Sequence, residues 1–333
     1  MKIDIFNHVM LPKYKEALYK HADRFPTEKA VQDKRPILTD YERRLEKIEK
    51  YEGYKQIICT TMPPIEEVVD DPKEALKLAR ICNDEMFEIV SSYPNVFLGA
   101  IANIPLNNIE IALEETRRAL EELKFKGIQI YTRVRGKPLS SEELFPLYEL
   151  MVGYDLPIWI HPMRSSWQPD YFEEKVSFHQ IFSIFGWPFE TAAAMTRLIF
   201  SGIFERFPNI KFITHHAGGI VPYLADRIKV HYDNGLERLG LKNFPGLTKH
   251  PIEYYKLFYA DTALNGNPSA LRCALEFFGE ERLLFGTDMP YDVENGDISI
   301  RETIRAVEEL TEDKDIKEKI FFKNALRVLK LSI

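Results

Sequence analysis

Four short apolar runs in this chain each end at a residue that can bind a metal ion or move a proton. The runs end at His8, at His161, at the neighbouring pair His215 and His216, and at Asp288. In parallel α/β barrels the active site lies at the carboxyl ends of the strands, so polar groups repeated at that position indicate one shared site. Imidazole and carboxylate groups are suited to metal ligation and to acid–base catalysis. The pattern favours an enzyme.

Each of these residues, taken alone, also has a structural explanation. His8 and His161 could be hydrogen-bonded core histidines, and Asp288 could cap a helix or occupy a turn before Pro290. A carboxylate that follows buried residues needs a cation, hydrogen bonds or a raised pKa to offset the cost of desolvation. The recurrence of such residues at four strand ends favours the functional interpretation.

The neighbours His215 and His216 should face opposite directions, because side chains alternate along a strand. Only one of them is therefore expected to reach the pocket. The following Gly218-Gly219 pair lets the backbone turn closely around a ligand. Asp261 could orient a histidine or cap a turn.

Eight strand-like segments alternate with amphipathic segments, which is typical of βα units and predicts a single α/β barrel of the TIM type with loop insertions. The expected strands are residues 2–8, 56–61, 96–103, 127–132, 157–161, 211–216, 257–262 and 282–288. The clearest expected helices are residues 41–50, 72–91, 109–123, 142–152, 190–206, 269–278 and 298–309. Asp40 and Ser141 are candidate amino-terminal caps.

Two connections, residues 9–39 and 163–188, are longer than the usual two to six residues and leave the catalytic end of the barrel. The second is rich in aromatic residues, including Trp187. Such side chains could enclose a planar substrate, cover the barrel mouth or form a contact between subunits.

Length and composition fit one globular domain over residues 1–333, with 45% hydrophobic and 29% charged residues. No apolar stretch approaches the roughly 20 residues that span a bilayer, and no secretory signal pattern opens the chain, so a cytoplasmic location is expected.

A net charge of -7 argues against nucleic acid as a partner. The three widely spaced cysteines, Cys59, Cys82 and Cys273, suit reduced buried thiols without a functional role.

Four separated motifs carry a resemblance to a known family. They are Gly-Trp-Pro-Phe-Glu-Thr at residues 186–191, Phe-Ser-Gly-Ile-Phe-Glu-Arg-Phe-Pro at 200–208, Thr-His-His-Ala-Gly-Gly at 214–219 and Phe-Gly-Thr-Asp-Met-Pro at 285–290. With these motifs in order over nearly the whole sequence, the chain resembles the amidohydrolase-related family that includes aminocarboxymuconate semialdehyde and resorcylate decarboxylases. The resemblance implies a barrel of the metal-dependent hydrolase type that holds one divalent ion, zinc or manganese.

Transferred residue by residue, the resemblance implies His8, His161 and Asp288 as metal ligands and His216 as the acid–base residue, with His215 structural. Asp288 is a second candidate for proton transfer. Arg227 falls where the muconate-type decarboxylases place an arginine that reaches a substrate carboxylate across a dimer interface, which implies a homodimer. An ordinary ion pair is an equally weighted explanation for this arginine.

Phe6 departs from the family pattern, which supplies histidine or glutamate at this position. Phenylalanine cannot coordinate a metal, and Asn7 should point away from the site. Two histidines and one aspartate still form a possible facial set for a divalent ion with water in the open positions. A site that works without metal is the alternative. Phe6 and Trp187 are candidates for packing against a planar substrate.

The expected activity is metal-assisted, nonoxidative decarboxylation of an aromatic or conjugated carboxylic acid, with proton delivery from His216 or Asp288. One alternative is hydrolysis of an ester, lactone or amide by activated water. A second is a non-catalytic barrel that binds a small anion. Release of carbon dioxide, incorporation of water, or binding without turnover would distinguish the three, because the fold does not.

Overall fold

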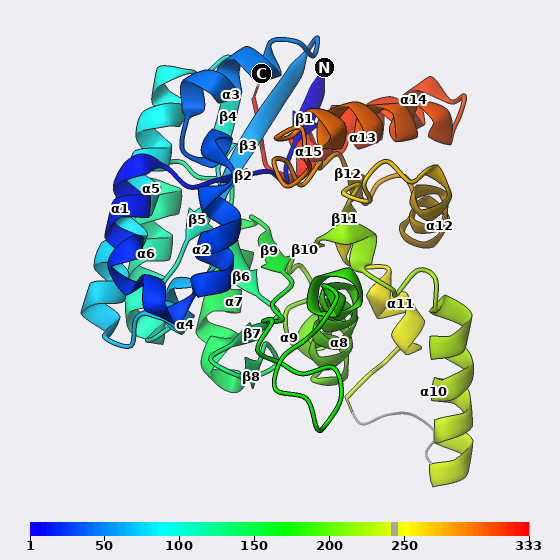
Figure 1. The fold of residues 1–333 in the computed structure, drawn as a ribbon. Coiled ribbons are helices and arrows are strands. Elements are labelled where there is room, and N and C mark those ends of the chain that lie inside the picture. The colour runs from blue at the N-terminus through cyan, green and yellow to red at the C-terminus, as the bar shows by residue number, and fades with distance from the viewer. Residues whose placement is uncertain (241–245, 333) are drawn as a thin grey trace.

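Eight strand positions form the centre of the protein in a computed structural model that describes residues 1–240 and 246–332 (Figure 1). In order they are β1 (Lys2–Asp4) with β2 (His8–Val9), β3 (Tyr54–Thr60), β4 (Phe97–Ala100) with β5 (Ala102–Asn103), β6 (Ile128–Tyr131), β9 (Ile158–His161), β10 (Phe212–Thr214), β11 (Tyr259–Asp261) and β12 (Leu283–Leu284). Neighbouring positions pair in parallel throughout. A short antiparallel pair, β7 (Arg133–Val134) and β8 (Lys137–Pro138), lies outside this ring.

The first and eighth positions are hydrogen-bonded to each other, which closes the barrel. Ile5 N donates to Phe285 O at 2.9 Å, and Asp288 N donates to Phe6 O at 2.8 Å. The predicted (β/α)8 barrel is confirmed, and each observed strand lies within or beside its predicted range. Several are shorter than predicted. The eighth ends at Leu284, although Thr287 N and Asp288 N still donate to Phe6 O before the backbone enters the left-handed region at Asp288, where φ is 59°.

The helices between the first five strand positions are α1 (Pro12–Leu18), η1 (Tyr19–Arg24), α2 (Pro26–Asp33), η2 (Pro36–Leu38), α3 (Tyr41–Ile48), α4 (Ile65–Val68), α5 (Pro72–Ser92), α6 (Ile109–Glu121), η3 (Glu142–Leu144) and α7 (Phe145–Tyr154). Those that follow are η4 (Phe182–Gly186), α8 (Trp187–Phe200), α9 (Ile203–Arg206), η5 (His216–Gly218), α10 (Ala225–Leu239), α11 (Pro251–Tyr255), α12 (Pro268–Phe278), α13 (Asp297–Leu310), α14 (Lys314–Glu318), η6 (Lys319–Lys323) and α15 (Asn324–Val328). Figure 1 shows α10 standing away from the barrel. No helix in the described parts of the chain is long and apolar enough to span a membrane.

Local sequence explains where several helices begin. The predicted cap Asp40 accepts a hydrogen bond from Arg43 N at the start of α3, and Asp71 does the same for Glu74 N at the start of α5. Ser141 was expected to cap a helix, but its hydroxyl donates to Pro138 O instead. The segment predicted as one helix over 190–206 is two helices, because the chain turns through a left-handed conformation at Gly202.

The two long connections differ in structure. Residues 9–39 fold into α1, η1, α2 and η2, and proline occupies the first turn of α1, α2 and η2. Most of residues 163–188 is irregular, with η4 near its end. The predicted burial of the cysteines is confirmed for Cys59 and Cys82, but Cys273 is only partly buried.

The apolar core has two parts. One lies between the strands and the surrounding helices, and the other fills the barrel itself, where Ile57, Trp159 and Ile213 are among the buried members. Phe6 belongs to this inner cluster and is 0% exposed. The inner cluster supports the polar residues at the carboxyl ends of the strands from below.

Candidate active site

A pocket of about 300 Å³ lies at the carboxyl ends of the barrel strands. Its walls are His8, Thr27, Glu28, Val31, Gln32, Arg35, Thr61, Met62, His161, Gln180, Phe182, Ser183, Trp187, His216, Asp288 and Tyr291. The lining thus contains four of the sequence-predicted chemical residues and Trp187. A larger cavity of about 490 Å³ is lined by residues such as Asn107 and Arg135 and contains none of the predicted site residues. The first pocket is therefore the candidate active site.

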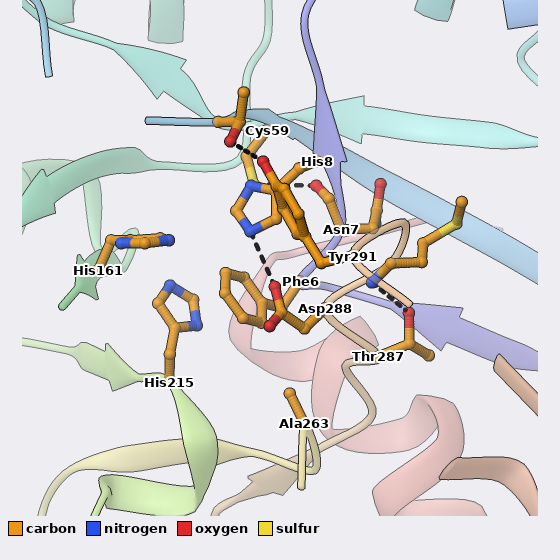
Figure 2. A network of polar contacts seen from close by, with 12 residues as sticks. Phe6, Asn7, His8, Cys59, His161, His215, Ala263, Thr287, Asp288 and Tyr291 are labelled. Atoms are coloured by element: carbon orange, nitrogen blue, oxygen red, sulfur yellow. Dashed lines mark hydrogen bonds and ion pairs between the residues drawn. The ribbon is translucent and has the colours of Figure 1, made fainter. Parts of the chain in front are cut away.

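His8 lies at the start of β2 and is held from both ring nitrogens. Its Nδ1 is 3.2 Å from Thr60 O, and its Nε2 is 3.1 Å from Asp288 Oδ1 (Figure 2). The buried Arg44 donates to His8 O at 2.7 Å and fixes the backbone of this strand. Burial lowers the pKa of His8, but the neighbouring Cys59 and Asp288 outweigh it and raise the pKa to about 10.

Asp288 connects two of the histidines. Its Oδ1 contacts His8, and its Oδ2 is 3.5 Å from His216 Nε2. Burial alone would raise the pKa of this carboxyl, but contacts with His216 and His8 hold it well below the usual range. Its left-handed φ of 59° is a strained conformation for a residue other than glycine, and such strain clusters at functional sites.

Asp4 anchors the loop that carries Asp288. Asp4 lies at the end of β1 and accepts hydrogen bonds from Thr287 N at 3.1 Å and from the Thr287 hydroxyl at 2.6 Å. The Tyr54 hydroxyl donates to the same carboxylate. Nothing in the local sequence distinguishes Asp4, because its partners come from segments that are distant along the chain.

His161 closes β9 and faces the pocket from the side opposite Asp288. Its Nδ1 lies 2.7 Å from Pro162 O, so the proton belongs on Nδ1 and Nε2 carries a free lone pair. Burial, followed by the charges of His8 and His215, holds the pKa of His161 well below its usual value. A neutral imidazole with one nitrogen fixed by a carbonyl is the form that ligates metals.

His215 and His216 point to different places, as predicted, but not through strand alternation, because β10 ends at Thr214 and His216 has a left-handed φ of 53°. His216 lines the pocket, and its ring lies nearly parallel to that of Trp187, with 6.4 Å between centroids and 15° between planes. His215 is 0% exposed, and its Nδ1 lies 2.8 Å from Asp261 Oδ2. Burial lowers the pKa of His216, but its contact with Asp288 raises it above the usual value. Asp261 orients a histidine, one of the two roles considered for it.

The phenyl ring of Phe6 lies among the imidazoles rather than on the pocket wall. Its centroid is 3.5 Å from that of His215, 4.7 Å from His8, 5.8 Å from His161 and 5.9 Å from His216. Figure 2 shows the ring between His215 and Asp288. Gly286 leaves room for it, because a Cβ there would lie 3.0 Å from the Cβ of Phe6. Phe6 thus fixes the arrangement of the imidazole rings.

Trp187 and Arg227 lie in different environments. Trp187 Nε1 donates to Arg164 O at 3.0 Å, which fixes the indole at the pocket wall. Arg227 is exposed on α10 and is not among the residues that line this chain's pocket.

Sequence reasoning missed several residues of the pocket wall. Arg35 approaches from the end of α2, donates to Tyr291 O at 3.2 Å and stacks over the Tyr291 ring. Its buried Nε has no hydrogen-bond partner. Tyr291 also hydrogen-bonds Thr61. Their positions in the sequence were the one indication that these residues could reach the pocket, because Arg35 lies in the first long connection and Tyr291 follows the Asp288 motif.

The donor types of His8, His161 and Asp288 fit a divalent metal. His161 has its Nδ1 beside a backbone carbonyl, which leaves its Nε2 free to ligate. His8 also has its Nδ1 beside a carbonyl, but its Nε2 is paired with Asp288 Oδ1 and would have to exchange this contact for the ion. The aspartate is charged. Among the described residues, however, no three His, Cys, Asp or Glu side chains already surround a common point closely enough to form a complete metal site. The three side chains are therefore of the chemical types that bind a divalent metal, but they are not spaced as the ligands of a bound ion.

Comparison with known proteins identifies relatives over most of the chain. The amidohydrolase family model matches residues 3–331. A 2-amino-3-carboxymuconate-6-semialdehyde decarboxylase of Dictyostelium discoideum is 29% identical over 82% of this chain and 72% of its own length. A gamma-resorcylate decarboxylase of Polaromonas is 28% identical over 80% of this chain and 82% of its own.

A solved structure shares the fold. The dihydroxybenzoic acid decarboxylase of Polaromonas, crystallised with manganese and the inhibitor 2-nitroresorcinol, matches with a TM-score of 0.80 and 24% identity, covering 99% of this chain and 97% of that one. These findings confirm the family resemblance inferred from the four sequence motifs.

Proposed function

The chain belongs to the amidohydrolase family, and we propose that it is a metal-assisted, nonoxidative decarboxylase of an aromatic or conjugated carboxylic acid. The observation that carries this proposal is the convergence of His8, His161, His216 and Asp288 on one pocket. Named decarboxylases among its relatives support the same activity. The pocket volume of about 300 Å³ suits a small, single-ring substrate.

His8, His161 and Asp288 would hold one divalent ion, zinc or manganese. When bound, the ion supplies Lewis-acid stabilisation of the negative charge that develops on the substrate carboxylate or a neighbouring hydroxyl. The rest of the protein would hold these ligand side chains in place. Asp4 and Arg44 restrain the backbone segments that carry Asp288 and His8.

His216 is the proposed proton donor. Asp288 Oδ2 stabilises the protonated ring from a position 3.5 Å from Nε2. As the bond between the ring carbon and the carboxylate breaks, the electron pair stays on that carbon, which takes the proton from His216 while carbon dioxide leaves. Solvent then returns a proton to His216. Trp187, parallel to His216, provides a flat wall for a planar substrate.

Two arginines are proposed to bind substrate carboxylates. Arg35 has an unpartnered Nε at the pocket wall, which favours contact with an anion. Arg227 would act on the pocket of a second copy of the chain. Exposed aromatic side chains on residues 163–189 and α10's exposed Val230 and Leu239 support a homodimer, because aromatic and apolar residues are typical of subunit contacts. The largest exposed aromatics are Trp167, Tyr171, Phe172, Phe178, Phe185, Phe189 and Tyr223.

Product analysis in labelled solvent tests the activity. The manganese- or zinc-loaded protein would be incubated with hydroxybenzoates, conjugated dicarboxylates, and esters, lactones and amides of the same acids, in D2O and separately in H2¹⁸O. Decarboxylation predicts carbon dioxide, one deuterium at the vacated carbon and no ¹⁸O in the organic product. Cleavage with ¹⁸O in the organic product would establish hydrolysis instead. Binding without turnover across the panel would establish a non-catalytic barrel.

A further inference from the structure

One face of α2 forms a wall of the candidate active site. Side chains three and four residues apart lie on the same side of a helix. The residues of α2 that line the pocket follow this spacing and are Thr27, Glu28, Val31 and Gln32. Arg35 continues the same wall just beyond the end of the helix.

We propose that Glu28 is a specificity-determining residue, whose carboxylate accepts a hydrogen bond from a hydroxyl or amino group of the substrate. This inference rests on the proposed decarboxylase function and deepens it by naming a substrate class. The substrate would be an aromatic or conjugated acid that carries a hydrogen-bond donor in addition to the carboxylate that it loses.

The Glu28 carboxylate has no partner beyond its own backbone. The side chain is partly buried, and burial raises the pKa of its carboxyl. A hydrogen bond from the Glu28 backbone N–H is the one contact in the described parts of the chain that opposes this effect. A carboxylate withdrawn from water is stabilised by a donor, and the pocket that Glu28 lines is where a ligand would supply one.

The polar neighbours of Glu28 on the same face are occupied in holding α2 in place. Gln32 Nε2 donates to Met62 O, and its Oε1 accepts from the Tyr19 hydroxyl at 3.3 Å. Thr27 Oγ1 lies 3.2 Å from Ser166 Oγ, which joins α2 to the second long connection. These contacts fix the helix, so the Glu28 carboxylate is presented to the pocket from a fixed backbone.

Glu28 and Arg35 place opposite charges at separate points of one wall. The Arg35 guanidinium lies 5.1 Å from the ring centroid of Tyr291, whose ring is 5.4 Å from that of His8, so the cation is beside the catalytic residues. Glu28 precedes Arg35 by seven residues, a helix rise of roughly 10 Å. A pocket with this charge arrangement is complementary to a ligand with an acidic group at one end and a donor elsewhere.

A glutamate in the first turn of a helix also has a structural explanation, because the helix dipole stabilises a negative charge there. That role concerns the folded chain alone and does not distinguish one ligand from another. The two explanations therefore differ in how replacement of Glu28 changes the ranking of ligands.

Binding of matched ligands to the full-length chain in manganese-containing buffer tests the proposal. The panel is 2-hydroxybenzoate with a hydroxyl, amino or methoxy group at ring position 3, 4 or 5. Methoxy keeps the oxygen and lacks the donor. At one ring position or more, the hydroxyl or amino compound should bind wild type at least about 10-fold tighter than the methoxy compound, as expected for a hydrogen bond to a charged group. Isothermal titration calorimetry measures Kd, and carbon dioxide release is measured on the same samples.

Three variants separate recognition from folding and net charge. Glu28→Leu should reduce this ratio of Kd values below about threefold, and Glu28→Gln, which keeps an acceptor but loses the charge, should give an intermediate ratio. Asp23→Leu makes the matched change at an exposed acid outside the pocket and should keep the wild-type ratio. Circular dichroism shows whether each variant folds, and the Glu28→Gln ratio decides the question if Glu28→Leu does not.

A wild-type ratio in folded Glu28→Leu, or in Glu28→Gln where that variant decides, would overturn the inference and leave the proposed decarboxylation intact. Wild type that binds none of the panel, or that has no preference for a donor, would also overturn it. A preference that depends on Glu28 without release of carbon dioxide would support the recognition and count against decarboxylation of these acids.

Discussion

The phenyl ring of Phe6 stacks on the imidazole of His215 with 3.5 Å between centroids. This contact places a hydrocarbon ring at the polar end of the barrel, where it also lies edge-on to His8 and His161. The carboxylate of Asp288 links His8 and His216 above the same ring. The candidate catalytic side chains of the pocket thus pack against the phenyl ring of Phe6, and replacing this residue should have measurable effects.

Replacing Phe6 by alanine should destabilise the protein by about 3–5 kcal/mol, because the change removes a fully buried phenyl group and leaves a cavity. The free energy of unfolding would be measured by urea titration. Phe172→Ala is the matched control, since Phe172 is fully exposed and its removal should change stability by less than about 0.5 kcal/mol. Equal stabilities of the two variants would contradict the assigned packing role of Phe6.

Replacing His216 by asparagine should reduce kcat for decarboxylation by about 10²- to 10⁴-fold, the usual contribution of a positioned proton donor. Metal content should remain that of wild type, because His216 is not a proposed ligand. Steady-state kinetics and elemental analysis of the same preparation provide both values. A reduction in kcat below tenfold would exclude His216 as the main proton donor.

Arg227 can be tested in mixed dimers. His216→Asn and Arg227→Ala variants should each be weakly active alone, whereas a mixed dimer contains one site with both residues intact, supplied by different subunits. Activity should therefore recover when the two variants are dissociated and reassembled together. Reassembly of His216→Asn with itself is the control. If the mixture gains no activity although mixed dimers form, Arg227 does not act across an interface.

Glu66 gives a pH-dependent prediction away from the catalytic groups. It is buried on α4, and burial raises its pKa from 4.5 to about 8. The folded chain therefore keeps a proton that the unfolded chain loses, so the stability linked to Glu66 is fully present below pH 4.5 and decreases as the pH rises through 8. Between pH 6 and pH 8 the decrease amounts to at most about 3 kcal/mol.

Urea titration at these two pH values tests the Glu66 prediction. Glu66→Gln should show a smaller decrease in unfolding free energy than wild type, whereas Glu67→Gln, at the neighbouring position, should follow wild type. A Glu66→Gln variant with the same pH dependence as wild type would show that Glu66 ionises normally in the folded chain.

Much of the fold could be predicted from the sequence because barrel strands and helices have different periodicities, and all eight strand positions were located. The grouping of the candidate site residues could be predicted as well, since His8, His161, His216 and Asp288 all line one pocket. These residues are recognisable because each ends an apolar run. Such a pattern involves only neighbouring residues and can therefore be recognised in the sequence alone.

Other features depend on contacts between distant segments and could not be predicted. Arg35 reaches the pocket because the first long connection folds into helices, although nothing in its local sequence distinguishes it from other charged residues. The unpaired nitrogen of His215 becomes visible only when Asp261 and Phe6 are placed around it. Asp4 was likewise inconspicuous, because its Thr287 partner lies at the opposite end of the chain.

The proposed metal site is tested by the metal content of the purified chain, measured by inductively coupled plasma mass spectrometry in wild type and His161→Ala after reconstitution with manganese or zinc. About one divalent ion per chain is expected in wild type and a large loss in the variant, because His161 presents its free Nε2 to the site. No stoichiometric metal in wild type, or undiminished metal in His161→Ala, would contradict the proposed metal site.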